Sequence, residues 1–165
     1  MIATKDWLKA SWYAGRDMLR PVTGGSSASD IHIHQQETPV MVPIRSLGPS
    51  YRERITQHLL QLEPADRYLR FGYAANDEQI RRYAEQLDFN RDEIFGIYNR
   101  RLELIAMAHL AFSEHPEHKQ CAEFGVSVLK QARGRGFGAR LFERAVMHAR
   151  NEGVNMVFIH ALSEN

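Results

Sequence analysis

The chain has 165 residues, 44% of them hydrophobic and 25% charged, which is typical of a single globular domain. Its formal net charge of +1 provides no overall attraction to nucleic acid or to an anionic membrane. The single cysteine, Cys121, excludes an internal disulfide and a cysteine-rich zinc site. No apolar run is long enough to span a bilayer and the N-terminus lacks a signal-peptide core, so we expect a cytoplasmic protein.

Residues 1–38 are expected to form a helix and a linker ahead of the main domain. Residues 4–20 place apolar side chains, both tryptophans among them, on one side of a helix. This helix either lies on the main domain or contacts a second subunit, because aromatic residues often anchor interfaces. Residues 22–38 are rich in Gly, Ser and Thr, which predicts a linker. His32 and His34 lie in this linker without further ligands at suitable spacing, so no metal is expected.

The main domain is expected over residues 39–165, beginning with a strand and a helix. Residues 40–45 alternate as a strand does, and Pro43, which cannot donate a ladder hydrogen bond, predicts an edge position. Ser50 is expected to cap the helix that follows. Pro64 is expected to end or kink that helix.

Two further helical segments are predicted before the next strand. Residues 66–71 indicate a short helical turn. Asn76 is followed by Gln79 at the spacing of a capping box, which predicts the start of another helix.

The second half of the chain predicts strands and one long helix. The strands are expected over 93–99, 102–112, 121–129 and 155–162, and the helix over 138–152. The first two strands form a hairpin through Arg100 and Arg101. The apolar character of the last strand favours burial on both faces of a central sheet.

A glycine-rich turn joins the third of these strands to the long helix. Glycines alternate there with larger residues, so the backbone can turn sharply and its N–H groups can approach a ligand closely. The helix start adds unpaired N–H groups and the positive end of the helix dipole, while the arginines add cationic donors. This combination predicts a site for a diphosphate.

The strand, turn and helix together resemble motif A of the GCN5-related N-acetyltransferases (GNAT), written Arg/Gln-x-x-Gly-x-Gly/Ala. The matching residues are Val126, Ser127, Val128, Arg133, Gly134, Arg135, Gly136, Phe137 and Gly138. The resemblance covers most of the chain, from about Val40 to Asn165, but is specific only near this motif. It implies an α/β (α+β) fold with a mixed, mostly antiparallel central sheet, flanking helices and splayed central strands.

The resemblance also implies how acetyl-CoA binds. In the family, the amides of the loop hold the pyrophosphate of coenzyme A, and the preceding strand pairs with the pantetheine arm. Val128 is expected to pair with that arm, and the N–H of Val126 to stabilise the oxyanion. Ser127 is expected to point to the opposite face from these two residues. Asn165 matches an asparagine that often touches coenzyme A in the family.

Glu123 is the predicted general base, since a similarly placed glutamate acts as the base in some protein-lysine acetyltransferases of the family. The alternative is a structural glutamate paired with an arginine. Gly125 is expected to allow a bulge that opens the strand. Cys121 has no histidine arranged to activate it, so a buried thiol is expected rather than a nucleophile.

The acceptor is expected to be a primary amine, either a small molecule or a protein lysine. The family shapes its acceptor site from the first helices and the loop between them, so the candidate lining residues here are Tyr68, Arg70, Phe71 and Tyr73. Alternatively, the aromatic residues belong to the core and the arginine is solvated.

The family normally continues beyond the equivalent of Asn165 with a helix and two strands. One of these elements carries a tyrosine that protonates the departing thiolate in many members. We therefore expect either a truncated chain or completion by a partner, such as a second copy in a homodimer. Two functions remain open at this point. One is acetyl transfer by direct attack of an amine in a ternary complex, and the other is a non-catalytic CoA-binding sensor or regulatory module.

Overall fold

The computed structural model describes residues 42–159. The predicted N-terminal helix, the linker with its histidines, and Asn165 lie outside the described residues. The strands are β1 (Arg45–Ser46), β2 (Glu93–Tyr98), β3 (Leu104–Phe112), β4 (Cys121–Val128) and β5 (Met156–Ile159). The helices are α2 (Arg52–Leu60), α3 (Pro64–Phe71), α4 (Asp77–Glu85) and α5 (Phe137–Asn151), with 3₁₀ turns η1 (Pro49–Tyr51), η2 (Pro116–His118) and η3 (Lys130–Ala132).

The strands form a five-stranded sheet in the order β1-β2-β3-β4-β5. The first four strands pair antiparallel, and β4 pairs with β5 in parallel. This arrangement confirms the predicted mixed, mostly antiparallel sheet flanked by helices. It also confirms that the first strand lies at an edge, although it begins at Arg45, after Pro43.

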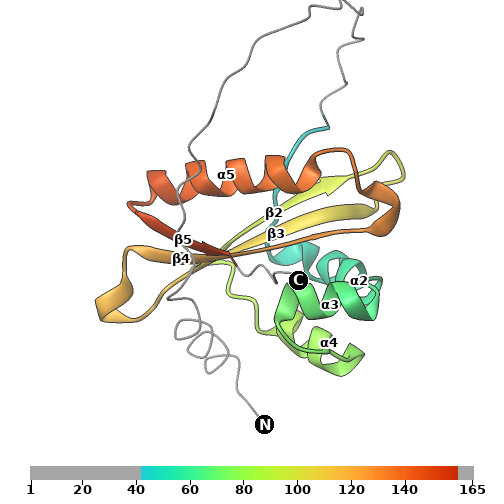
Figure 1. Ribbon diagram of the computed structural model, residues 1–165, viewed down its shortest axis with the longest axis horizontal. Coiled ribbons are helices and arrows are strands. Elements are labelled where there is room, and N and C mark those ends of the chain that lie inside the picture. The colour runs from blue at the N-terminus through green and yellow to red at the C-terminus, as the bar shows by residue number, and fades with distance from the viewer. Residues whose placement is uncertain (1–41, 160–165) are drawn as a thin grey trace, which may run out of the picture. The chain divides into compact units, whose positions relative to one another are not determined.

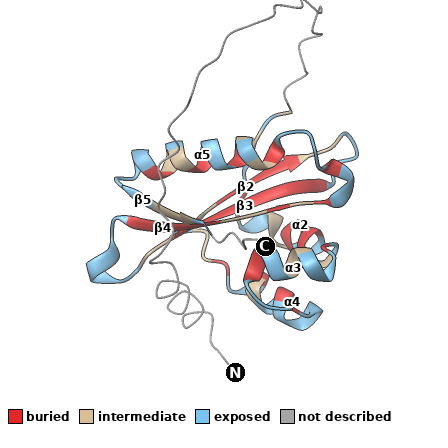
Figure 2. Cartoon of the chain, in the orientation of Figure 1, coloured by how far each residue is buried: buried red, intermediate tan, exposed pale blue. Residues whose placement is uncertain are grey.

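Helices cover the two faces of the sheet. Figure 1 shows α5 along one face and α2, α3 and α4 on the other. β3 lies in the middle, and each of its residues from Leu104 to Ala111 is buried, as the red colour in Figure 2 shows. A strand covered on both faces is apolar along its whole length, which is why its sequence, Leu-Ile-Ala-Met-Ala-His-Leu-Ala, lacks strict alternation. The one polar side chain in this run, that of His109, takes part in a hydrogen-bonded network described below.

The start of the first helix differs from expectation. Ser50 does not cap α2, because η1 places it inside a 3₁₀ turn that the N–H of Tyr51 closes on the carbonyl of Gly48 at 3.0 Å. The helix α2 ends at Leu60, before Pro64, as predicted; Pro64 itself occupies the first turn of α3, where its missing N–H breaks no helical hydrogen bond. The capping box of Asn76 and Gln79 is confirmed at the start of α4.

The expectation that the last strand is buried on both faces is wrong for its described part. Met156 and Ile159 are 45% and 50% exposed. Within residues 42–159, β5 has a strand partner on one side only, so it forms an edge of the described sheet. The apolar composition of β5 therefore predicted more burial than its described residues have. None of the helices in the described range is long and apolar enough to cross a membrane.

One buried histidine ties α2 to the sheet. His58 contacts the carbonyl oxygen of Leu104 through Nδ1 and the hydroxyl of Ser127 through Nε2, both at 2.7 Å. Burial is the main cause that lowers the pKa of His58 from 6.5 to about 4. The imidazole is therefore neutral in the folded protein at neutral pH.

This histidine makes stability sensitive to acid. Between pH 6.5 and about 4, the unfolded chain binds a proton at His58 that the folded chain does not bind. The free energy of unfolding should therefore fall as pH drops through this window, by about 3 kcal/mol in all. Urea unfolding at a series of pH values measures this change. The slope should be shallower in His58→Gln, whereas His115→Gln, in an exposed loop, should keep the wild-type slope; equal slopes in all three would contradict the assignment.

Candidate active site

The backbone of β4 presents alternate peptide groups to opposite sides. The N–H of Ser113 donates to the carbonyl of Cys121 at 3.1 Å, and the N–H of Leu129 donates to that of Ile105 at 2.9 Å. In an antiparallel ladder, every second residue of a strand bonds to the neighbouring strand through its N–H and C=O groups. Because Cys121 and Leu129 both bond toward β3, all odd-numbered residues of β4 direct their N–H and C=O groups toward β3. The even-numbered residues of β4 direct theirs away from β3.

The side of β4 that faces away from β3 is called its outer edge here. Only the first part of this edge pairs with a described strand. β5 pairs with β4 as far as Ile159, which lies opposite Phe124. Val126 and Val128 lie beyond that point, so no strand in the described range covers their outward N–H groups. The carbonyl of Val128 accepts from Nε of Arg133 at 3.4 Å, which agrees with its outward direction. The predicted splaying of the two strands concerns residues after 159, outside the described range.

The loop after β4 turns at two glycines in the left-handed region. Gly134 has a φ of +74° and Gly136 a φ of +77°, and Gly136 is the N-cap of α5. Residues with a side chain disfavour this region because Cβ crowds the following carbonyl. A Cβ built on either glycine meets no atom within 4 Å, so the outer side of the loop is open. Glycine is needed here for backbone conformation rather than to avoid a protein contact.

The amides of this loop are unused as donors. Among the backbone hydrogen bonds of residues 42–159, none has an N–H from 134–139 as its donor. The first amide at this end of α5 with a backbone acceptor is that of Arg140, which donates to Gly136 at 3.1 Å. The unused donors thus lie at the positive end of a 15-residue helix. Backbone donors in this arrangement suit phosphate oxygens.

The side chains of the loop are used in different ways. Nη2 of Arg133 lies 2.5 Å from a carboxylate oxygen of Asp66 in α3, so this predicted ligand already has an anionic partner. The guanidinium of Arg135 lies 4.8 Å from the ring centroid of Phe137 and remains exposed. The ring of Phe137 is buried, which leaves only its amide to face a ligand. Gly138, in the first turn of α5, lies next to Val128.

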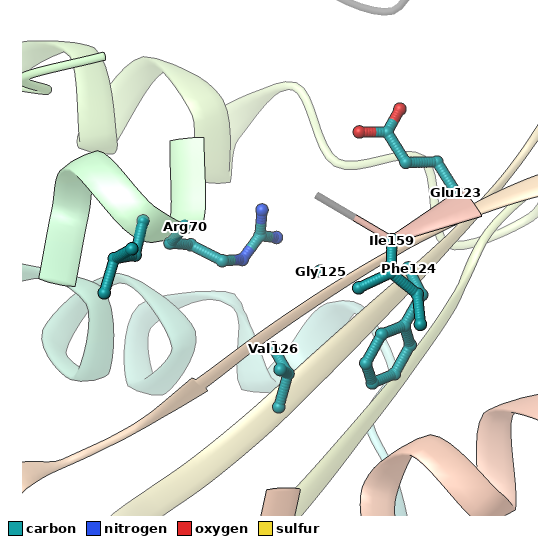
Figure 3. A pocket seen from close by; sticks show the side chains of 7 residues that line it. Arg70, Glu123, Phe124, Gly125, Val126 and Ile159 are labelled. Atoms are coloured by element: carbon teal, nitrogen blue, oxygen red, sulfur yellow. The ribbon is translucent and has the colours of Figure 1, made fainter. Parts of the chain in front are cut away.

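A hollow lies where α3 approaches the outer edge of β4 (Figure 3). Its lining residues are Leu69, Arg70, Glu123, Phe124, Gly125, Val126 and Ile159. Glu123 enters from β4 and Arg70 from α3, and both side chains belong to largely buried residues. The structure thus brings the predicted base, Glu123, and the predicted oxyanion donor, Val126, to one hollow.

The four candidates for the acceptor side have different positions. Arg70 lines the hollow, whereas Phe71 is buried in the core. Tyr68 and Tyr73 are exposed and do not line the hollow. Leu69 lines it and was not predicted from the sequence, because its role depends on how α3 is placed against β4.

Gly125 does not form the expected bulge. Its pairing with His109 continues the regular β3–β4 register without a shift. The reason for glycine here is instead the guanidinium of Arg70, since a Cβ on Gly125 would lie 2.5 Å from Cζ and Nη1 of that arginine. The glycine makes room for a cation against the strand.

Two other residues of β4 are occupied within the fold. Ser127, predicted as part of the cofactor-binding strand, directs its hydroxyl to His58 and its peptide groups toward β3. It therefore has no group facing the outer edge. Cys121 is buried and burial raises the pKa of its thiol, which disfavours the reactive thiolate.

One group of side chains in the described range could approach a cation. Ligand atoms of His115, Glu117 and His118 lie within 4.8 Å of one another, and all three residues are exposed. They belong to the loop around η2, and none of the three lines the hollow.

Solved structures share this fold. The GNAT domain of S. lividans PAT has 20% sequence identity and a TM-score of 0.57, and the match covers 70% of this chain and 69% of that one. A predicted acetyltransferase from Clostridium acetobutylicum, crystallised with acetyl-CoA, has 18% identity, a TM-score of 0.55 and coverage of 73% and 81%. An N-acetyltransferase from Staphylococcus aureus Mu50 has 16% identity, a TM-score of 0.54 and coverage of 72% of each chain. No curated protein matches the sequence.

The sheet, the helix start and these likenesses define an acetyltransferase fold. Residues 56–165 match the model of the Acetyltransferase (GNAT) family, and because this match spans more than half of the chain, the protein belongs to that family. It is an acetyl-CoA-dependent N-acetyltransferase, with acetyl-CoA as its co-substrate.

The glycine loop allows a test of acetyl-CoA binding. Gly136→Val should weaken binding at least about tenfold, because it strains a left-handed residue and adds a side chain beside the unused amides. Calorimetric titration with acetyl-CoA measures the affinity. Gly153→Val is the matched control, since Gly153 has a φ of +78° and nothing within 4 Å of its built Cβ, but lies after the other end of α5. Equal losses of affinity in both variants would show that strain, not the loop's donors, causes the effect.

Proposed function

We propose that this protein transfers the acetyl group of acetyl-CoA to a primary amine by direct attack in a ternary complex. The observation that carries the proposal is the continuity of three features. Unused amides at the start of α5 are followed, along the outer edge of β4, by the N–H of Val126 and by the hollow that contains Glu123. These are the groups that a diphosphate, a thioester and an amine require, in that order.

The diphosphate of acetyl-CoA binds to the backbone from Arg133 to Gly138. Its charge is met by the N–H groups of the loop, by the positive end of α5 and by Arg135, which is exposed. Arg133 contributes less charge, because Asp66 already pairs with it. The acetyl-CoA in the Clostridium acetobutylicum structure supports a ligand of this kind on this fold.

The rest of the cofactor follows β4. The outward peptide groups of Val126 and Val128 have no strand partner in the described range, so they can bond to the pantetheine arm as a strand would. Ser127 contributes indirectly, since its hydrogen bond to His58 holds β4 against α2. Asn165, outside the described residues, is proposed as a further contact with coenzyme A.

The chemical step needs a base and an oxyanion donor. The acceptor amine arrives as an ammonium ion, and Glu123 accepts one of its protons. The freed lone pair then forms the new C–N bond at the thioester carbonyl, and the positively charged nitrogen that results loses a second proton to water. The carbonyl oxygen becomes an oxyanion that the N–H of Val126 stabilises. Collapse of this intermediate breaks the C–S bond, and the thiolate of coenzyme A leaves with the electron pair and takes a proton from water. The acceptor is a small amine or a protein lysine.

Replacing the proposed base tests the mechanism. Glu123→Gln should lower kcat roughly 100-fold or more, because the amide cannot accept the proton. The affinity for acetyl-CoA should stay within about twofold, since Glu123 is not part of the loop amides or of the outward-facing valines. Release of free coenzyme A thiol, measured with a panel of primary amines and lysine peptides, gives the rates.

The matched control is Glu152→Gln, an exposed glutamate at the end of α5. It should retain the wild-type rate. An unchanged rate in Glu123→Gln would remove Glu123 as the base. Tight acetyl-CoA binding by the wild type without turnover of any amine would replace the proposal by the non-catalytic binding module.

A further inference from the structure

Arg70 is a buried cation placed beside the proposed reaction centre. Arg70 is only 6% exposed, and its guanidinium lies against Gly125 of β4. In Figure 3 the side chain extends from α3 toward Gly125 and into the hollow that Glu123 also lines. A guanidinium keeps its charge at any ordinary pH, so this charge is present while the hollow is in use.

A hydrogen-bonded chain fixes one end of Arg70. Nη2 donates to the hydroxyl of Tyr83 at 2.8 Å, and this hydroxyl lies 2.5 Å from Nδ1 of His109. Nε2 of His109 lies 2.8 Å from a carboxylate oxygen of Asp92. Asp92 is paired in turn with Arg91, which donates from Nε at 2.7 Å. The chain crosses the core from the hollow to the surface and orients Arg70 through Tyr83.

This chain does not neutralise Arg70 locally. The pKa of Asp92 is held below its usual value by Arg91 and His109 against the opposing effect of its burial, so its negative charge is compensated at the far end of the chain. In the described part of the structure, no carboxylate forms an ion pair with Arg70 within 4.0 Å. Nε of Arg70 is buried and has no hydrogen-bond acceptor.

A buried cation with no carboxylate in ion-pair contact is costly, so the position of Arg70 favours an additional anionic ligand. The hollow is where that ligand can approach, because Arg70 is one of its walls. Glu123 is the other charged wall, and the remaining lining residues are apolar or glycine. The partners of the arginine therefore account for its orientation and leave its charge available to a substrate.

We propose that Arg70 binds the carboxylate of the acceptor, so that the acceptor is a small α-amino acid. This inference rests on the proposed function, since it assigns the amine of the same molecule to Glu123. Glu123 and Gly125 are two residues apart on one strand, which separates their positions by roughly 7 Å. A carboxylate on the arginine that covers Gly125 and an amine near Glu123 fit the short separation of these groups in an α-amino acid.

The test compares each common L-amino acid with its primary amide, which has the amine but no carboxylate. Wild-type protein should use the preferred amino acid roughly 10- to 100-fold better than its amide in kcat/KM. In Arg70→Met this preference should disappear, mainly through a higher KM for the acid. Arg82→Met, an exposed arginine on α4 whose partner is Glu78, should keep the wild-type preference.

Two further variants separate this role from a structural one. Gly125→Ala keeps the charge but displaces it from the strand, so it should also reduce the preference for the acid. Tyr83→Phe removes the anchor of Arg70 and should raise KM for the acid with a smaller effect on kcat. Circular dichroism and thermal unfolding show whether each variant is folded, and calorimetric titration of the CoA-saturated full chain with acid and amide gives binding without turnover.

The outcomes distinguish the two proposals. Acetyl-CoA binding and amine acetylation with equal use of acids and amides would overturn the role of Arg70 and leave the proposed function intact. Equal loss of acid and amide in Arg70→Met would also overturn it, because that pattern indicates a structural arginine. Failure of the wild type to bind acetyl-CoA would overturn the proposed function, whereas selective binding of acids that Arg70→Met abolishes would still support the carboxylate site.

Discussion

The antiparallel register between β3 and β4 is the constraint on which the candidate site depends. It directs the peptide groups of Val126 and Val128 to the outer edge and those of Gly125 and Ser127 to β3. A shift of one residue would reverse both assignments, because side-chain and peptide directions alternate along a strand. The contacts on either side hold this register. Ser127 bonds to His58 of α2 on one face, while Phe124 packs against Phe142 of α5 on the other.

The same register aligns two different kinds of binding group. At Val126 and Val128, past the pairing with β5, the outer edge of β4 offers donors and acceptors that no described strand uses. After the 3₁₀ turn η3, the left-handed glycines lead into the start of α5, where the amides of residues 134–139 donate to no backbone acceptor in the described range. A ligand with an extended arm and a diphosphate can therefore contact both stretches of backbone. Because backbone groups supply these contacts, few side chains of the motif need to touch the cofactor.

Much of this backbone arrangement was predictable. The spacing of glycines after a β-branched strand indicated the strand, turn and helix, and the capping box of Asn76 located the start of α4. Predictions of helix caps and of strand burial from neighbouring residues were less successful. Ser50 was predicted to cap a helix, but it lies with Pro49 in a 3₁₀ turn. The apolar residues of β5 predicted burial, whereas Met156 and Ile159 are about half exposed in the described part of the structure. The bulge at Gly125 was wrong because a glycine can also make room for another element's side chain.

The sequence by itself determined the order of strands and helices, the glycine-rich turn before α5, and the alternation that separates Ser127 from Val126 and Val128 on β4. These features depend on residues close together in the chain, through φ preferences, capping and alternation. Only the tertiary structure decided that Arg70 of α3 lies against Gly125, that Tyr83, His109 and Asp92 orient it, and that Arg133 pairs with Asp66. These contacts join residues from separate elements, so they depend on how helices pack across the sheet, which periodicity along the chain does not specify.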